Sequence, residues 1–139
     1  MIEVKKMELI AANYASEEKL NTFLQHNKDV EREQLLEKGY VVELKGTIEG
    51  CFVMDAVDED VYWLKQLYIT KSAAASLPVL LESILALAKE KQAKEVFVHS
   101  HQPMVDIVLE SLQFYPQKEN ALVHAPPEKE GYWWTYNVS

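Results

Sequence analysis

Residues 61–69 read VYWLKQLYI, and residues 71–90, KSAAASLPVLLESILALAKE, follow after a single threonine. The first stretch is rich in β-branched and aromatic residues, which predicts a strand. In the second stretch the apolar residues between Leu77 and Ala88 share one broad face and lysines lie in the last turn, which predicts a long helix. Residues 95–99, EVFVH, predict another strand. A strand, a helix and a strand in this order predict a right-handed crossover between two parallel strands.

The residues before this unit predict an antiparallel meander. Residues 40–44 predict one strand, residues 45–47 a turn, and residues 48–54 a second strand that leads towards residues 61–69. Residues 55–60 contain four acids, which could attract a cationic acceptor at one end of the sheet, but a solvated turn is the commoner case and is expected here. Short turns between three successive strands are typical of a meander.

The N-terminal end adds a strand and two helices. Residues 2–10 begin with an alternating pattern that predicts the first strand. Ser16 is a suitable N-cap, and two glutamates follow it in the first turn of the first helix. A second helix is expected to begin near Asp29 and to end at Gly39.

The C-terminal end completes the predicted fold. Pro103 opens a last helix, and residues 121–124 and 132–138 predict two further strands. The order is β-α-α-β-β-β-α-β-α-β-β. We therefore expect an α/β fold of the mixed α+β type, in which a mixed, mostly antiparallel sheet of about seven strands is flanked by four helices. No repeat or linker divides residues 1–139, so a single domain is expected.

Composition and charge narrow the classes of function. The 139 residues are 48% hydrophobic and 26% charged, as in an ordinary globular domain. The net charge is −8 and Arg32 is the one arginine, so no basic face for nucleic acid is expected. The N-terminus lacks the apolar core of a signal peptide, and the longest uncharged apolar run, residues 72–81, is too short for a membrane span. The single cysteine, Cys51, makes no internal disulfide, which is consistent with a reducing cytoplasm.

The layout resembles that of the GCN5-related N-acetyltransferase (GNAT) superfamily. The resemblance covers nearly the whole chain and is strongest from Tyr40 to Phe114. It rests on a hairpin with Ile48-Glu49-Gly50, the strand at 63–69, a loop, a long helix, the strand at 96–99 and a helix that ends at Leu112-Gln113-Phe114. This resemblance implies acetyl-CoA as a co-substrate.

The resemblance also implies where the cofactor would bind. In the family, the strand similar to residues 63–69 bonds the pantetheine arm through its backbone, and the loop and helix start that follow hold the pyrophosphate. The implied cofactor-binding residues are Leu67, Tyr68, Ile69, Lys71, Ser72, Ala73, Ala75, Ser76, Leu77 and Gln102.

The loop departs from the family pattern, which usually reads Arg/Gln-x-x-Gly-x-Gly/Ala. Residues 71–78 contain no glycine, Ser72 stands where a basic or amide residue is usual, and Pro78 removes one N–H group. The chain is thus identified as a divergent member with a degenerate pyrophosphate loop, in which Lys71 and the hydroxyls of Ser72 and Ser76 would partly substitute.

The catalytic groups stay unassigned. Aligned on Phe114, the chain has Leu109 where the family often has a tyrosine that protonates the thiolate, Gln113 in place of a glycine and Gln102 in place of an asparagine. The acid would be another group, such as Tyr115 or water. A general base is not evident either, because the strand at 61–69 carries no carboxylate.

Histidine and cysteine offer few further candidates. His99 and His101 lie at the end of a predicted parallel strand, where a neutral imidazole could deprotonate an acceptor amine. A strand-end histidine that is exposed to water, or that caps the helix beginning near Pro103, is the commoner case. The four histidines have no cysteine or carboxylate at ligand spacing, so no metal is expected. Cys51 has no neighbouring base and is expected to be a small core residue.

The last predicted strand is unusually aromatic. Tyr132, Trp133, Trp134 and Tyr136 occupy both of its faces. One face would be core, and the other would be a wall of the acceptor site or a homodimer contact.

These observations support three hypotheses about function. The first is an acyl-CoA-dependent N-acetyltransferase that transfers the acyl group directly to a primary amine of a small molecule or peptide. The alternative is a non-catalytic protein of the same fold that binds a partner protein or senses CoA. The third is a groove adapted to another small ligand. None of them involves nucleic acid or a membrane.

Overall fold

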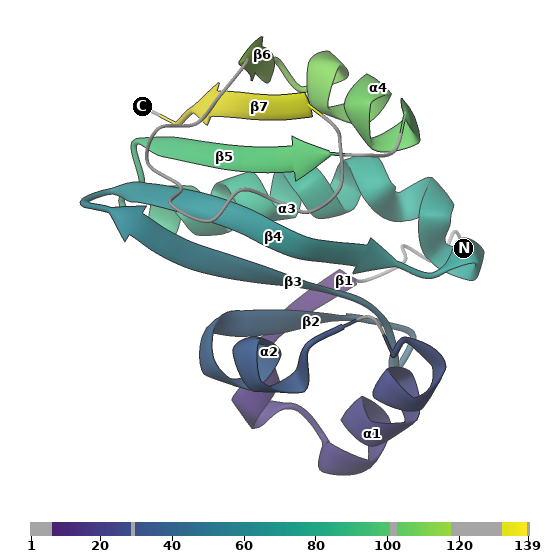
Figure 1. The fold of residues 1–139 in the computed structure, drawn as a ribbon. Helices are drawn as coiled ribbons and strands as arrows, with labels where there is room; N and C mark the ends of the chain where they lie inside the picture. The colour runs from purple at the N-terminus through teal and green to yellow at the C-terminus, as the bar shows by residue number, and fades with distance from the viewer. Residues whose placement is uncertain (1–6, 29, 101–102, 118–131, 139) are drawn as a thin grey trace, which may run out of the picture. The chain divides into compact units, whose positions relative to one another are not determined.

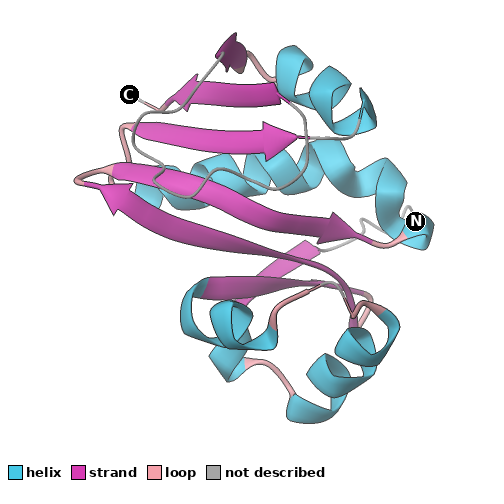
Figure 2. Ribbon diagram, in the orientation of Figure 1, coloured by secondary structure: helices cyan, strands magenta, loops and turns pink. Residues whose placement is uncertain are grey.

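The computed structural model describes residues 7–28, 30–100, 103–117 and 132–138. Figure 1 shows the ribbon and Figure 2 the helices and strands. In chain order the elements are β1 (Met7–Ala11), η1 (Ala12–Tyr14), α1 (Glu17–His26), α2 (Arg32–Lys38), β2 (Gly39–Leu44), β3 (Thr47–Asp58), β4 (Val61–Ile69), η2 (Lys71–Ser76), α3 (Leu77–Glu90), β5 (Glu95–Ser100), α4 (Pro103–Ser111), β6 (Tyr115–Gln117) and β7 (Tyr132–Asn137).

The strands form one mixed sheet in the order β1-β2-β3-β4-β5-β7-β6. β4 and β5 pair in parallel across the α3 crossover, whereas β1 with β2, β2 with β3, and β7 with both β5 and β6 pair antiparallel. The predicted fold class, a mixed seven-stranded sheet with four α-helices, is therefore confirmed. The predicted strand at 61–69 coincides with β4, and Pro103 opens α4.

The solvated turn expected over residues 55–60 is wrong in its extent. β3 continues through Asp58, and only Glu59 and Asp60 form the turn. The physical reason lies in Asp55, whose carboxylate is 3.0 Å from the Nζ atom of Lys65 on β4. This ion pair neutralises Asp55 within the sheet, so it does not behave as part of an exposed acidic cluster.

One strand was not predicted, because of a proline. β6 contains Pro116, which cannot donate to a strand ladder and so argues against a strand in the sequence. β6 is the last strand in the sheet order, where a proline is tolerated. The strand predicted at 121–124 lies outside the described residues. So does Asp29, near which the second helix was expected to begin; α2 begins at Arg32.

The chain divides into two compact units, each described by itself. Unit 1 is Met1–Val53 with Gln66–Leu80, and unit 2 is Met54–Lys65 with Leu81–Ser139. β3, β4 and α3 each contribute residues to both units. That the whole chain is a single domain stays a prediction.

Unit 1 is built around an apolar cluster that α1, α2, β2 and β3 share. Ser16 caps α1 by accepting a hydrogen bond from the Lys19 backbone N–H at 3.4 Å, as the sequence indicated. Leu20 and Phe23 then lie on the buried side of α1. The buried residues of the cluster are Ala12, Leu20, Phe23, Leu35, Val41, Ile48, Cys51 and Val53.

Unit 2 has β5 at its centre, and two of its helix ends are closed in the same way. After α4, the Phe114 N–H bonds the Leu109 carbonyl at 3.0 Å and the Gln113 N–H bonds the Glu110 carbonyl at 3.1 Å. These are the two hydrogen bonds of a Schellman motif, with Gln113 in the left-handed region at φ 73°. The end of α3 repeats the motif with Gln92 at φ 61°.

One helical stretch of the described residues, Lys71–Glu90, is long and apolar enough by length and composition alone to cross a membrane. The core helix of a globular protein can satisfy the same criterion. The apolar residues Leu77, Leu80, Leu81, Ile84 and Ala88 are all buried within the fold. We therefore interpret this stretch as a core helix.

Candidate functional site

Gln66 interrupts the regular backbone of β4. Its φ is 52°, in the left-handed region that a residue with a side chain rarely adopts within a strand. The described parallel pairing with β5 involves Val61–Leu64, the residues before this point. β4 is thus distorted just ahead of Leu67, where the predicted cofactor-binding segment begins.

Hydrogen bonds within unit 1 hold Gln66 in this conformation. Its side-chain Oε1 accepts from the Glu31 backbone N–H at 3.1 Å, and its Nε2 donates to Gln34 at 3.0 Å. Its carbonyl oxygen lies 3.7 Å from the Sγ atom of Cys51, which donates to it. Gln66 therefore links the distortion of β4 to the start of α2, a role that the sequence did not indicate.

The predicted strand residues Leu67, Tyr68 and Ile69 form the last part of β4. The Tyr68 side chain is 38% exposed, and its ring meets Phe23 of α1 edge to face at 5.9 Å. The strand ends at Thr70, whose backbone N–H donates to the Glu49 carbonyl at 2.8 Å. This segment thus contacts α1 through the Tyr68 ring and β3 through the Thr70 backbone.

The predicted pyrophosphate loop forms η2 and the start of α3. A cavity of about 280 Å³ lies beside it. Three predicted residues line this loop cavity: Ser72, Ala73 and Ser76. The others do not line it; Lys71 and Ala75 are exposed, and Leu77 is buried. Gln102 lies outside the described residues.

The β2–β3 turn supplies further lining that sequence reasoning missed. Lys45, Thr47 and Glu49 face the loop cavity together with Leu44. Lys45 is an exposed cation at φ 52° in the turn, so it supplies positive charge that Lys71 does not bring to the cavity. The sequence indicated a turn at Lys45-Gly46. It did not indicate that this turn lies beside residues 72–76.

Glu49 works against an anion in the loop cavity. Its Oε2 atom accepts hydrogen bonds from the hydroxyls of Thr70 and Ser72, the latter at 3.0 Å. These two hydroxyls lie 3.1 Å apart. The Ser72 hydroxyl is thus engaged with a carboxylate, whose negative charge repels a phosphate. That the loop is a degenerate pyrophosphate site stays a prediction.

Unit 2 contains a group of aromatic side chains from β4, β5 and β7. The ring of Trp133 lies 5.6 Å from that of Trp63 and 5.1 Å from that of His99. The Lys65 ammonium lies 4.8 Å from the Trp63 ring and also pairs with Asp55. His99 is half-buried against an indole, so it is not the freely solvated strand-end histidine that is commoner. Its role as a base stays a prediction, and His101 lies outside the described residues.

Two polar atoms in unit 2 have no hydrogen-bond partner among the described residues. They are the indole Nε1 of Trp63 and the Oγ1 of Thr135, both shielded from solvent. On β7, Trp133 and Trp134 are buried, and the indole of Trp134 donates to Asp106 of α4 at 2.8 Å. Both indoles of β7 are thus used within unit 2, and a homodimer contact at this strand stays a prediction.

Cys51 is a core residue, as predicted. It is fully buried in the apolar cluster of unit 1. Burial raises the pKa of its thiol from 9.0 to about 12. The reactive thiolate is therefore scarce at neutral pH, and Cys51 is unsuited to nucleophilic catalysis. Leu109, for which the resemblance implied the position of a tyrosine, is also fully buried.

Comparison with known proteins identifies the fold. No protein-family model matches the chain, and no curated protein sequence matches it. Several solved structures do match. An acetyltransferase of the GNAT family from Staphylococcus aureus Mu50 has a TM-score of 0.72 and 15% identity, covering 96% of this chain and 100% of that one.

Two other matches contain a coenzyme. N-acetylglutamate synthase from Neisseria gonorrhoeae, complexed with coenzyme A and N-acetyl-glutamate, has a TM-score of 0.73 and 13% identity, covering 99% of this chain and 36% of that one. The Campylobacter jejuni N-acetyltransferase PseH, in complex with acetyl coenzyme A, has a TM-score of 0.67 and 11% identity, covering 96% of this chain and 100% of that one. At these identities the likeness defines the fold: this chain has the fold of the GNAT acetyltransferases.

Proposed function

We propose that the protein is an acyl-CoA-dependent N-acyltransferase that transfers an acetyl group directly to a primary amine. The observation that carries this proposal is the match of nearly the whole chain to acetyltransferase structures, two of them with CoA or acetyl-CoA bound. Because one fold can host unrelated functions, the proposal also needs support from the residues of the site.

Within unit 1, the end of β4 supports the proposal. The distortion at Gln66 sits ahead of Leu67, Tyr68 and Ile69, whose backbone the proposal assigns to the cofactor. The loop cavity follows directly in the chain and has a cation, Lys45, and two hydroxyls, Ser72 and Ser76, in its wall. These groups suit the phosphates of a coenzyme, whereas Glu49 opposes them. The fit is thus partial, and affinity should be lower than a glycine-rich loop would give.

The chain's contribution to the reaction would be positioning. Acetyl-CoA supplies the activated acyl group when bound. The backbone N–H groups of Leu67–Ile69 would orient that group and donate a hydrogen bond to its carbonyl oxygen, which becomes negative as the amine attacks. The amine must attack in its neutral form: the C–N bond forms as the C–S bond of the thioester breaks, CoA leaves as a thiolate, and the proton lost by the amine passes to that thiolate through groups that we do not assign.

A second candidate function is a non-catalytic protein that senses CoA or binds a partner. The carboxylate of Glu49 in the wall of the loop cavity favours it, because weak cofactor binding is the property expected of a lost phosphate site. Leu109, which cannot donate a proton, fits this candidate as well.

Binding of acetyl-CoA and CoA, measured by isothermal titration calorimetry, tests the proposal. We expect micromolar to submillimolar affinity. Lys45→Ala should weaken binding by about two- to fivefold, the size of an exposed charge interaction, and Glu49→Gln should tighten it by a similar factor. Lys28→Ala removes the same charge at an exposed site that does not line the loop cavity, and it should change nothing. The absence of binding at millimolar cofactor would refute the acyltransferase.

A further inference from the structure

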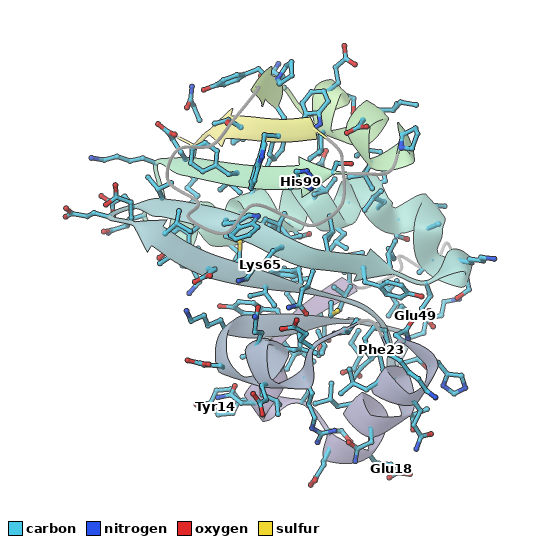
Figure 3. The ribbon with its side chains drawn as sticks, in the orientation of Figure 1. Tyr14, Glu18, Phe23, Glu49, Lys65 and His99 are labelled. Atoms are coloured by element: carbon cyan, nitrogen blue, oxygen red, sulfur yellow. The ribbon has the colours of Figure 1, made fainter. Side chains whose placement is uncertain are left out.

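Unit 1 contains a second and larger cavity, which the proposed function does not use. Its volume is about 460 Å³, within the range of small-molecule sites. One side is a face of α1, and the other comprises the start of β3 with its preceding turn and Thr70. We call it the α1 cavity. Figure 3 shows Phe23 and Glu49, one from each side, and Glu18 nearer the start of α1.

The floor of the α1 cavity is apolar and belongs to the core of unit 1. Phe23 and Ile48 line it, and each is only 5% exposed. The Phe23 ring also makes an edge-to-face contact with Tyr68. Both residues belong to the apolar cluster of unit 1, so the floor is held by the core of that unit. It offers an apolar surface to the body of a ligand.

The polar end of the α1 cavity is a carboxylate held in one orientation. Glu49 lines the cavity, and the hydroxyls of Thr70 and Ser72 both bond to its Oε2 atom. A carboxylate can accept about four hydrogen bonds through its two oxygens, so it retains capacity for a ligand donor. Since its orientation is already fixed, little entropy is lost when a ligand binds.

The polar groups that α1 contributes are mostly engaged with α1 itself. The Thr22 hydroxyl donates to the Glu18 carbonyl at 3.0 Å. The His26 Nδ1 atom lies 2.9 Å from the Thr22 carbonyl. The Ser16 hydroxyl caps the helix. Glu49 is therefore the lining group best placed to select a ligand.

The charge around the α1 cavity favours a cation. Its lining lysine, Lys19, forms an ion pair with Glu43 at 2.9 Å, which offsets its charge. Glu18, an exposed lining residue, adds a second negative charge to that of Glu49. The cavity thus attracts cations and repels anions.

We infer that the α1 cavity binds a small organic cation, a primary ammonium group on an apolar or aromatic body, with the ammonium on Glu49 and the body on Phe23 and Ile48. The inference concerns binding alone. It goes beyond the proposed acyl transfer and does not require the ligand to be acylated.

The test compares three probes of one shape and different charge: 2-phenylethylamine, 2-phenylethanol and 3-phenylpropanoate. Each is titrated into the full chain without cofactor, and amide shifts of Gly46, Thr70 and Ser72 report occupancy by NMR. We expect the amine to bind at least about tenfold more tightly than the alcohol, the size of one hydrogen bond to a charged group, and the propanoate not to bind. Equal affinities for amine and alcohol, or shifts confined to other residues, would overturn the inference.

Three variants separate charge from shape. Glu49→Gln keeps an acceptor for the hydroxyls of Thr70 and Ser72. It should lower the affinity for the amine to that for the alcohol. Thr22→Phe, at an exposed helix position, fills the cavity and should weaken amine and alcohol alike. Glu17→Gln removes the same charge from α1 outside the lining and should have no effect. An amine preference that survives Glu49→Gln would contradict the inference.

The same variants keep this inference separate from the proposed function. Glu49→Gln should abolish the amine preference while acetyl-CoA binding becomes tighter. Amine binding without any cofactor binding would refute the acyltransferase and leave the α1 cavity a cation site. Cofactor binding without a preference for the amine would refute the cation site and leave the proposed acyltransferase standing.

Discussion

Gly50 of β3 approaches the backbone of Tyr68 so closely that a Cβ atom on Gly50 would lie 2.6 Å from the Tyr68 carbonyl oxygen. The atom in the way is backbone and cannot rotate aside. Any side chain at residue 50 must therefore displace β4 where the proposal places the cofactor. Residue 50 must therefore be a glycine because of this close approach, and not because its φ is positive.

Gly50→Ala should destabilise the protein by about 1–3 kcal/mol, the range for overpacking at a tight contact. It should also weaken acetyl-CoA binding, because the Tyr68 backbone, which the proposal assigns to the cofactor, is displaced. Gly39→Ala is the matched control, since its Cβ would lie 2.5 Å from the Leu35 carbonyl oxygen, away from β4. We expect it to lower stability in urea without lowering cofactor affinity. Equal cofactor affinity in both variants would disprove the role given to the Tyr68 segment.

Gln113→Gly should stabilise the protein. Gln113 holds a left-handed conformation at the end of α4, which glycine adopts without steric strain. We expect a gain of about 0.5–1 kcal/mol and a Tm higher by about 2–4 °C. Glu110→Gly, inside the same helix, should instead destabilise by about 1 kcal/mol. A thermal unfolding curve for each variant checks this, and a lower Tm for Gln113→Gly would contradict the assigned motif.

Gln66→Ala should destabilise the protein because two hydrogen bonds are lost and the strained φ remains. At about 0.5–1.5 kcal/mol for each hydrogen bond, the expected loss is about 1–3 kcal/mol. Gln25→Ala, at an exposed position of α1, is the control and should change stability little. The urea midpoint of each variant is the measurement. An unchanged midpoint for Gln66→Ala would mean that its side chain does not hold the distortion of β4.

The thiol of Cys51 should be protected in the folded protein. With its pKa raised to about 12 by burial, it should react with iodoacetamide at pH 8.5 only through unfolding, and rapidly in urea. The folded pKa lies above the ordinary 9.0, so the folded state keeps the proton longer than the unfolded state. Stability from this group is complete below pH 9 and is lost as the pH rises towards 12. Fast alkylation of the native protein at pH 8.5 would contradict this burial.

The sequence predicts the fold well where the signal is local. The bounds of β4 follow from its aromatic and β-branched residues, and Pro103 marks the start of α4. The expectation for residues 55–60 fails because the Asp55–Lys65 ion pair joins residues that only the folded sheet brings together. β6 is not predicted because it contains Pro116, and a proline argues against a strand in the sequence.

The candidate site is harder to predict than the fold. Ser72, Ala73 and Ser76 do line a cavity, but the Lys45 and Glu49 that share it come from the β2–β3 hairpin. Nothing in the spacing of residues 45–49 and 72–76 indicates that they meet. The charge balance of the loop cavity depends on how the hairpin and residues 72–76 come together. The α1 cavity likewise combines segments that are far apart in the sequence: α1, residues 46–49 and Thr70.

The most direct test of the proposed function is the transfer reaction itself. The protein is incubated with acetyl-CoA and a panel of primary amines, and release of CoA thiol is followed together with the mass of each amine. The account predicts thiol release that depends on the amine, with a matching gain of one acetyl group on it. If acetyl-CoA binds but no amine is acetylated and no thiol is released, the protein is a CoA-binding member of the fold and not an acyltransferase.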